Sequence, residues 1–355
     1  MNSKRIGSGA LLDAQYKFRH NGRHPDGIPL NLSESHHNMT LPNRRTFLQQ
    51  TARAGLAVAA GSAAFSQVRL AAAAESKSGN PLAVFSKSFQ DRSIPQICRI
   101  FKEIGADGVD LTVRPGGHID PKNAAEELPP AVQAAQDAGV KIFFLTTAIT
   151  DPDETSEKLL ATAGDLGIDR VKLGYYKYKQ FGNLAREMDG VKKRLAAVIK
   201  MSKRHGVLPC VHIHSGKSIP SHGTMLYELI KDFSPDEIGA YVDPQHMTKE
   251  GGIDGWRQGL DLLGPWIALS SMKNFAWEKT DRDKYGQQQW QTINVPVADG
   301  VCPVPKYIDA LHKLGYQGVI SMHSEYKGGH SFQNLDTDGC IAQTAKDIEF
   351  VRQFV

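Results

Sequence analysis

Val211-His212-Ile213-His214-Ser215-Gly216 is the stretch of sequence that determines the architecture we expect for this chain. Successive side chains of a β-strand point to opposite faces, so the two histidines share one face while the valine and the isoleucine cover the other. Two imidazole groups therefore point into the same space.

A second stretch, Tyr241-Val242-Asp243-Pro244-Gln245-His246, places Asp243 and His246 where an apolar strand gives way to a polar turn. If both stretches are strands of one parallel barrel, these groups converge at its carboxyl end, where (β/α)₈ enzymes carry their active sites. The two stretches together predict a metal site or an acid/base site at that end.

Short apolar runs alternate with helical patterns from Pro81 onward. The expected strands are residues 82–85, 108–113, 140–147, 170–176, 207–214, 238–243, 267–273 and 319–323. The expected helices are residues 94–104, 131–138, 155–166, 188–205, 223–233, 255–263, 307–314 and 342–350. Strands that are each followed by a helix predict a closed parallel barrel rather than an open sheet. We therefore expect an α/β fold, a (β/α)₈ TIM barrel with a single domain.

Two segments interrupt this regular alternation, and both follow strands on the expected catalytic side. Arg114-Pro115-Gly116-Gly117-His118 follows the second strand, where Arg114 and His118 are candidate substrate contacts. The arginine offers a planar fork of donors to an anionic or polyhydroxyl ligand, although a loop-packing role stays open. Residues 274–303 form a long stretch that we expect to be a loop acting as a lid. Its Trp277 is a candidate for stacking on a sugar, with core packing as the alternative.

The composition excludes some classes of partner. The chain has 355 residues, is 41% hydrophobic and carries a formal net charge of +4, with no dense stripe of Lys and Arg, so a nucleic acid is not an expected partner. Its four cysteines lie far apart in sequence without metal-binding spacing. They are expected to be buried thiols, and a disulfide between distant ones stays open.

The N-terminus has the pattern of an export signal. Asn43-Arg44-Arg45-Thr46-Phe47-Leu48 matches the twin-arginine motif, and an Ala- and Gly-rich stretch leads to Ala72-Ala73-Ala74 before Glu75. We expect residues 39–74 to be a cleaved signal peptide, with Met39 as the true start and residues 1–38 as a disordered or mis-annotated extension. The mature barrel would span residues 75–355, be periplasmic or secreted, and have no stable membrane span. An uncleaved membrane anchor is the alternative.

Several motifs of the mature chain resemble those of the xylose isomerase-like barrels, the sugar phosphate isomerase/epimerase superfamily. They are Gly105-Ala106-Asp107-Gly108-Val109-Asp110, Asp243-Pro244-Gln245-His246, Met272-Lys273-Asn274, Val297-Ala298-Asp299-Gly300 and Gly315-Tyr316-Gln317-Gly318-Val319-Ile320-Ser321. The resemblance covers residues 81–355 and rests on the order and spacing of these motifs.

The resemblance implies a divalent cation held by a Glu, an Asp, a His and a Glu from the fifth to the eighth strand. The two Glu of that family also move a proton next to a carbonyl. The Asp is retained as Asp243, whereas the other three positions hold His212, Ser271 and His323.

A two-histidine, one-carboxylate set of His212, Asp243 and His323 is therefore the predicted metal site. Imidazole favours Mn, Fe, Co, Ni or Zn over Mg. His214, His246 and Glu325 are candidate proton carriers. Glu325 shares a strand face with His323 and could instead be a metal ligand, and Lys273 is a candidate electrostatic partner of a substrate oxygen. Core histidines, a turn-capping Asp243 and a salt-bridged Lys273 are the structural alternatives.

These residues predict an exported, metal-dependent enzyme that moves a proton α to a carbonyl of a sugar or keto-sugar, as an isomerase or epimerase. A lyase or hydrolase acting on glycosides or keto-glycosides at the same site is one alternative, and a metal-free carbohydrate-binding barrel is another. The expected partner is a small carbohydrate, and the sequence leaves open whether the chain forms a homo-oligomer.

Overall fold

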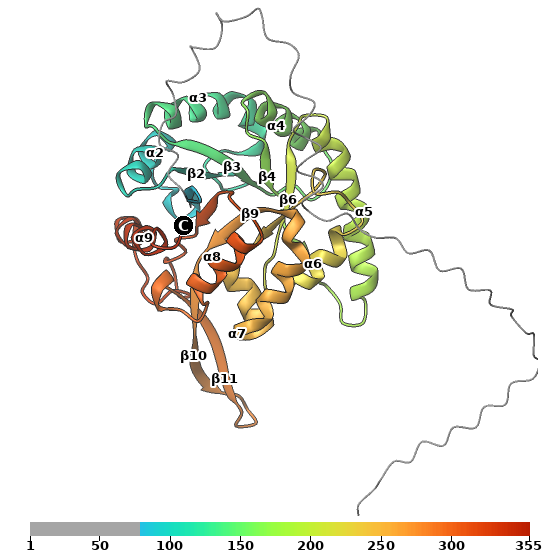
Figure 1. Ribbon diagram of the computed structural model, residues 1–355, viewed down its shortest axis with the longest axis vertical. Coiled ribbons are helices and arrows are strands. Elements are labelled where there is room, and N and C mark those ends of the chain that lie inside the picture. The colour runs from blue at the N-terminus through green and yellow to red at the C-terminus, as the bar shows by residue number, and fades with distance from the viewer. Residues whose placement is uncertain (1–78) are drawn as a thin grey trace, which may run out of the picture. The chain divides into compact units, whose positions relative to one another are not determined.

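The structure is a computed structural model that describes residues 79–355, so the predicted signal peptide and the extension before it lie outside the described residues. A closed parallel barrel is the centre of the fold (Figure 1). Its strands are β1 (Leu82–Phe85), β2 (Gly108–Val113), β3 (Lys141–Thr147), β4 (Arg170–Lys172), β6 (Leu208–His212), β8 (Gly239–Val242), β9 (Ile267–Met272) and β12 (Ile320–Met322). The barrel closes where β1 pairs in parallel with β12.

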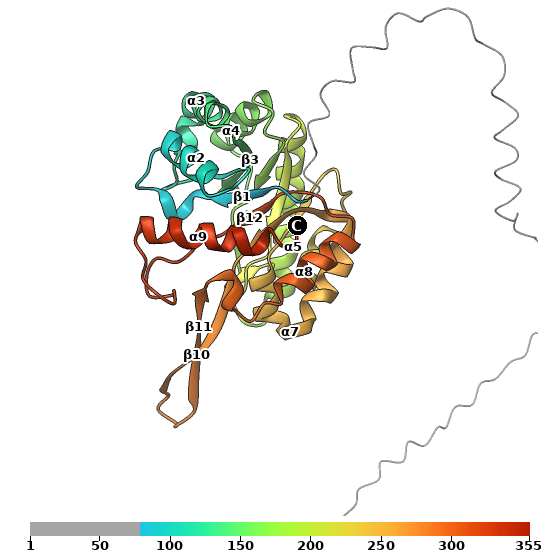
Figure 2. The ribbon, with the colours of Figure 1, turned by 60° about the vertical axis from the view of Figure 1, so that its left-hand side comes forward.

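Helices surround the barrel on its outer side (Figures 1 and 2). They are α2 (Ile94–Glu103), α3 (Ala124–Asp137), α4 (Glu154–Asp165), α5 (Leu184–Lys203), α6 (Gly223–Ile230), α7 (Pro244–Leu263), α8 (Val304–Lys313) and α9 (Thr337–Val351). Short 3₁₀ helices occur at η1 (Ser86–Phe89), η2 (Pro121–Asn123), η3 (Gly264–Trp266) and η4 (Val297–Asp299). The predicted TIM barrel fold is confirmed.

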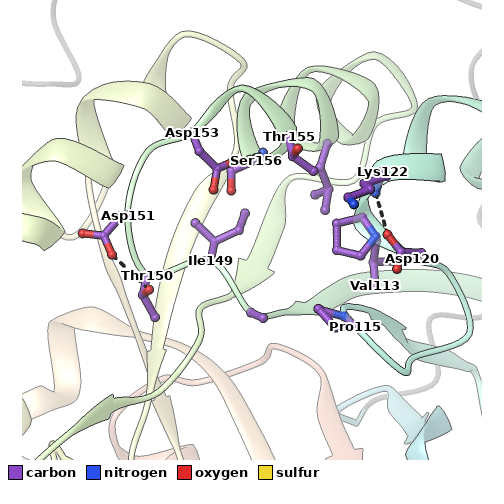
Figure 3. A pocket seen from close by; sticks show the side chains of 13 residues that line it. Val113, Pro115, Asp120, Lys122, Ile149, Thr150, Asp151, Asp153, Thr155 and Ser156 are labelled. Atoms are coloured by element: carbon purple, nitrogen blue, oxygen red, sulfur yellow. Dashed lines mark hydrogen bonds between the residues drawn. The ribbon is translucent and has the colours of Figure 1, made fainter.

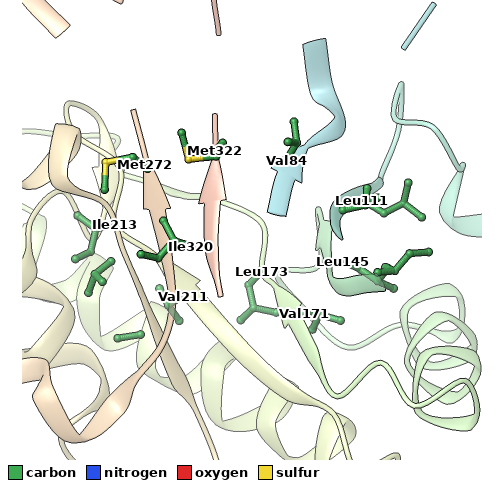
Figure 4. Packing of buried hydrophobic residues seen from close by; sticks show 14 of the residues in the cluster. Val84, Leu111, Leu145, Val171, Leu173, Val211, Ile213, Met272, Ile320 and Met322 are labelled. Atoms are coloured by element: carbon green, nitrogen blue, oxygen red, sulfur yellow. The ribbon is translucent and has the colours of Figure 1, made fainter. Parts of the chain in front are cut away.

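The alternation of side chains along the strands separates two apolar regions. Val84, Leu111, Leu145, Val211 and Ile320 point outward and pack with the helices in the main core (Figure 4). The strand residues of opposite parity form a smaller cluster inside the barrel, consisting of Ala83, Phe144, Cys210, Tyr241, Leu269 and Val319. Each large aliphatic side chain buried in this way contributes about 1.5–3 kcal/mol. Because Val211 faces the helices, the next residue of its strand faces the barrel interior.

Several helices begin earlier than the sequence predicted, and α3 and α7 show the largest differences. Helix α3 begins at Ala124 and includes Pro129 and Pro130 within it, although prolines usually mark a helix start. Its first turn carries Glu126 and Glu127, which favour the positive end of the helix dipole. Helix α7 begins at Pro244 and is broken at Gly252, where φ is 68°, so the predicted helix at 255–263 forms its second part.

The stretch predicted to be a lid loop is instead a β-hairpin, so that prediction is corrected. Strands β10 (Asn274–Arg282) and β11 (Gln288–Val295) pair antiparallel and project from the barrel (Figures 1 and 2). Gly286, with φ of 87°, supplies the left-handed backbone conformation of the connecting turn. A smaller two-stranded sheet joins β5 (Tyr176–Lys177) and β7 (Ser218–Ile219).

The cysteines are free and buried, as expected from their spacing. In residues 79–355, no helix combines the length and apolar character that crossing a membrane requires.

Candidate active site

A small cavity opens at the carboxyl ends of the barrel strands. Its volume is about 100 Å³. Most of its lining comes from the last residues of barrel strands or the residues just after them: Phe85, Lys87, Arg114, Thr146, Lys172, Tyr175, His212, His214, Tyr241, Lys273, His323 and Glu325. The structure thus brings together, from non-adjacent segments, most of the site residues predicted from the sequence.

His212 is held between two polar groups. Its Nε2 lies 3.2 Å from Asp243 Oδ2, and its Nδ1 lies 3.1 Å from the Tyr175 hydroxyl. A carboxylate only accepts, so Nε2 carries the proton and Nδ1 accepts from the tyrosine. Burial lowers the pKa of His212 to about 4 although Asp243 opposes this shift, so the ring is neutral at pH 7.

His214 presents a free ring nitrogen to the cavity. Its Nδ1 lies 3.1 Å from the carbonyl oxygen of Ser215 and must donate to it, which leaves the lone pair on Nε2. No residue within 79–355 forms a hydrogen bond with that Nε2. Burial, followed by the charge of Lys273, lowers the pKa of His214 to about 4. The side chain is therefore a neutral base at pH 7.

Asp243 is fully buried and has both a structural and an electrostatic role. It is the N-cap of α7, where Oδ1 accepts a hydrogen bond from the backbone N–H of His246 at 3.0 Å. Its Oδ2 faces His212, and Lys273 Nζ lies 3.5 Å away. Burial would raise the pKa of Asp243, but the neighbouring His246 and Lys273 hold it well below its ordinary value. The carboxylate is therefore ionised beneath the cavity.

His246 lies behind the cavity lining. Its ring stacks on that of His214, with 4.0 Å between the ring centroids, and its Nδ1 lies 2.9 Å from the hydroxyl of Ser215. Its Nε2 is buried without a hydrogen-bond partner among residues 79–355 and lies 3.7 Å from Asp243 Oδ2. Burial lowers its pKa well below the ordinary value. It thus supports His214 in the structure without lining the cavity.

Lys273, which is buried, and Glu325, which is partly exposed, form an ion pair at the cavity wall. Lys273 Nζ lies 3.0 Å from Glu325 Oε2, and Lys87 pairs with the other oxygen of Glu325. Burial opposes the charge on Lys273, but Asp243 and Glu325 outweigh it and raise its pKa above the ordinary value. Burial likewise opposes ionisation of Glu325, and Lys273 with Lys87 holds its pKa well below the ordinary value. Both groups are charged at pH 7, as the salt-bridge alternative anticipated.

His323 faces a polar cluster that the sequence did not reveal. Its Nε2 lies 2.9 Å from the Tyr241 hydroxyl and 3.8 Å from Asp110 Oδ2. Asp110 accepts hydrogen bonds from Thr146 at 2.6 Å and Ser321 at 2.9 Å. Burial raises the pKa of Asp110 to about 7 against these hydrogen bonds. A single aspartate at the centre of an otherwise apolar strand was the signal that could have identified it.

Lys172 and Arg114 also line the cavity. Lys172 Nζ lies 3.5 Å from the centre of the Tyr175 ring, and burial, followed by the charge of Arg114, lowers its pKa well below the ordinary value. The Arg114 guanidinium lies 5.7 Å from the centre of the Phe85 ring and has no ion-pair partner among the described residues. Its donors are therefore available to a ligand.

The structure does not place His118 and Trp277 at the cavity, although both were predicted to contact substrate. The His118 ring turns away because it is held by the Thr112 hydroxyl at 3.1 Å and the Phe89 carbonyl oxygen at 3.3 Å. Trp277 lies on the hairpin, is 51% exposed and packs against Phe275.

The predicted metal ligands are only partly brought together. His212 and Asp243 are adjacent, whereas His323 is hydrogen-bonded to Tyr241. In the part of the chain that the structure describes, no group of three or more His, Cys, Asp or Glu side chains has an arrangement that could hold a metal ion.

A larger cavity of about 510 Å³ lies outside the barrel mouth, between η2 and α4 (Figure 3). Its carboxylates already have structural partners. Asp120 caps η2, Asp153 caps α4 and Asp151 pairs with Arg194. Since its carboxylates are already paired and no histidine is among its lining residues, the smaller cavity is the better candidate for chemistry.

Comparison with known proteins supports the architecture. The family model described as "Xylose isomerase-like TIM barrel" matches residues 98–353. No curated protein sequence matches the chain significantly.

Solved structures share the fold at low sequence identity. A D-psicose 3-epimerase, determined in the presence of D-fructose, has a TM-score of 0.56 and 14% identity, covering 77% of this chain and 99% of that one. A 3-keto-D-glucoside 4-epimerase from E. coli has a TM-score of 0.56 and 13% identity with the same coverage. An IolI protein with a bound zinc atom has a TM-score of 0.58 and 14% identity, covering 78% and 99%.

Proposed function

The chain belongs to the xylose isomerase-like TIM barrel family, and from this premise we propose that it is an isomerase or epimerase that moves a proton at the carbon next to a carbonyl of a sugar or keto-sugar. The observation that carries the proposal is the combination of a neutral base, a carboxylate and an ammonium group around one cavity: His214, Glu325 and Lys273. Two structural neighbours are epimerases, which supports the same reaction class.

The ammonium group of Lys273 binds the carbonyl oxygen and stabilises the negative charge that develops there. Donors fixed in a buried site are effective in this role because they do not reorganise during the reaction. His214 Nε2 accepts the proton from the α-carbon, and the electron pair of the broken C–H bond passes into the enediolate. The protonated imidazole, with its low pKa, is a strong acid that readily returns the proton.

The destination of the proton distinguishes the two reaction types. Returning it from His214 to the neighbouring carbon completes an isomerisation once the hydroxyl proton has passed from one substrate oxygen to the other. Inverting the α-carbon requires a protonated group on the other face of the enediolate. Glu325 lines the same cavity, but it is ionised at pH 7 and must first take up a proton from solvent before it can deliver one.

Arg114 indicates what kind of substituent the substrate carries. Its guanidinium is free of ion pairs within the described residues and its fork matches a carboxylate, a phosphate or a pair of hydroxyls. The cavity of about 100 Å³ is small beside the roughly 300–1,000 Å³ of ordinary ligand pockets. We therefore infer that the cavity holds only the reacting end of the sugar and that the rest of the sugar lies toward the cavity opening.

The residues present do not fit the predicted divalent cation. His212 Nε2 donates to Asp243, His323 shares a hydrogen bond with Tyr241, and the Lys273 ammonium already lies beside Asp243 Oδ2. No catalytic step is therefore assigned to a metal, although the IolI neighbour holds zinc.

Export by the twin-arginine route remains a proposal carried by Arg44, Arg45 and the Ala72-Ala73-Ala74 site. Its test is the intact mass of the chain recovered from the periplasm of a host with this pathway. A mature N-terminus at Glu75 supports the proposal, and full-length chain retained in the cytoplasm contradicts it.

Solvent-exchange NMR tests the proposed reaction. The protein is incubated in D₂O with a panel of sugars and 3-keto-sugars, some with a carboxylate or phosphate, and deuterium at the α-carbon is followed. We expect exchange with at least one of them and its loss in His214→Gln, which removes the proposed base, while Glu278→Gln on the exposed hairpin strand retains it. Cleavage products without exchange in recovered substrate indicate the lyase or hydrolase alternative, and binding without exchange or product indicates the carbohydrate-binding alternative.

A further inference from the structure

The ammonium group of Lys273 lies between two carboxylates that come from different barrel strands. Its Nζ is 3.0 Å from Glu325 Oε2 and 3.5 Å from Asp243 Oδ2, and the residue is only 4% exposed. Asp243 follows β8 and Glu325 follows β12, the two strands on either side of the strand β9 that precedes Lys273, so one cation joins three adjacent strands at the barrel mouth. We propose that this ammonium takes the place of the divalent cation expected from the family resemblance, and that the chain works without a metal.

The charges around this position support an ammonium rather than a divalent cation. The four positions that the resemblance assigns to the cation would supply three carboxylates, but here they hold His212, Asp243, Ser271 and His323, with a single carboxylate. A divalent cation beside Asp243 would lie against the ammonium of Lys273, which together with Lys87 already pairs with Glu325. Like charges in a buried site repel strongly because little water screens them. A single positive charge between Asp243 and Glu325 avoids this repulsion.

The hydrogen bonds of the candidate ligands point the same way. The proton on His212 Nε2 is directed at Asp243, and its lone pair on Nδ1 faces the Tyr175 hydroxyl. A lysine ammonium has three N–H donors, and two suffice for Glu325 and Asp243. The third is available to a carbonyl oxygen in the cavity that Lys273 lines. The proposal thus deepens the function proposed above, on which its catalytic meaning rests.

Metal content and thermal stability of the full chain test this inference. The protein is purified, incubated with Mn²⁺, Co²⁺ or Zn²⁺, desalted, and measured for bound metal and melting temperature, with and without EDTA. We expect the wild-type chain to retain no cation above background and to melt at the same temperature with or without EDTA. A divalent ion retained near one per chain, with a melting temperature that EDTA lowers, would overturn the inference.

The variant Lys273→Gln provides the second measurement. It leaves Asp243 and Glu325 without the shared cation, so we expect a lower melting temperature that Mn²⁺ or Zn²⁺ partly restores. Lys172→Gln is the matched control, because Lys172 is also buried but lies over the Tyr175 ring; its melting temperature should not respond to these ions. A Lys273→Gln chain that melts like the wild type would also overturn the inference, and should this variant not fold, the wild-type metal content still decides.

These measurements are separate from the test of the reaction. A metal-loaded chain that exchanges the α-proton would overturn this inference and leave the proposed function intact. A metal-free chain that does not exchange the α-proton would support this inference and contradict the proposed function.

Discussion

Replacing Asp243 with asparagine should destabilise the protein strongly, because this carboxylate neutralises the ammonium of Lys273 and accepts the proton of His212. It is fully buried, so water cannot replace either interaction. Removing one partner of a buried ion pair costs about 3–5 kcal/mol. We expect the lower end, about 3 kcal/mol, because Lys273 keeps Glu325 and because asparagine caps a helix as well as aspartate does.

The alanine variant separates the cap from the charge. Asp243 accepts the N–H of His246 at the start of α7, and loss of such a cap costs about 1 kcal/mol. The free energy of unfolding of Asp243→Ala should therefore be about 1 kcal/mol lower than that of Asp243→Asn. Urea unfolding at pH 7, followed by circular dichroism, measures both differences in the free energy of unfolding.

The pH dependence provides a check on the charge. The folded pKa of Asp243 lies below its unfolded value of about 3.9. The stability that ionised Asp243 contributes is therefore fully present above about pH 3.9 and is lost only as the pH falls toward the folded pKa. The difference in the free energy of unfolding between the wild type and Asp243→Asn should be the same at pH 7 and pH 5. A gap below about 0.5 kcal/mol at pH 7 would refute the role assigned to this carboxylate.

Further predictions concern the catalytic groups, the pH and the hairpin. Glu325→Gln should lower kcat by about 10²–10⁴-fold with little change in KM if the carboxylate transfers a proton; an unchanged kcat would remove it from the mechanism. Arg114→Met should raise KM by roughly 10-fold or more for a substrate with a carboxylate or phosphate, because a hydrogen bond to a charged group contributes about 1.5–3 kcal/mol; an equal effect on neutral sugars would contradict the assignment. Because the free base of His214 has a pKa of about 4, kcat/KM should stay level from neutral pH downward and fall only as the pH approaches that value. The folded pKa values of His212 and His214 lie below the unfolded value of about 6.5, so stability should decline as the pH falls from 6.5 toward 4, as acid unfolding curves would show. Trp277→Ser should leave kcat and KM unchanged and the free energy of unfolding within about 0.5 kcal/mol, because Trp277 is half exposed on the hairpin; a raised KM would return it to the site.

Strand periodicity accounts for the part of the site that the sequence predicted. Once 207–214 and 267–273 are taken as barrel strands, the two-residue period directs His212 and Lys273 inward, and closure of the barrel brings them to one end. The contact of His323 with Tyr241 depends on the stagger between strands, which the order of residues along the chain does not reveal.

The misplaced residues have local causes. The hairpin was read as a loop because its exposed strands carry polar residues on both faces and lack the alternation that marks a half-buried strand. His118 lies just beyond a catalytic-side strand, but a tight turn lets Thr112 and Phe89 hold its ring. Asp110 was noted only as part of a motif, and its burial among Thr146 and Ser321 required the closed barrel.

A crystal structure of the protein with a bound keto-sugar, or with an analogue of its enediolate, tests the central claim most directly. We predict that the ligand's carbonyl oxygen will lie about 2.6–3.2 Å from Lys273 Nζ, with its α-carbon facing His214 Nε2. A ligand bound instead in the larger cavity beside Asp120 and Asp151, with Lys273 and His214 untouched, would contradict the account.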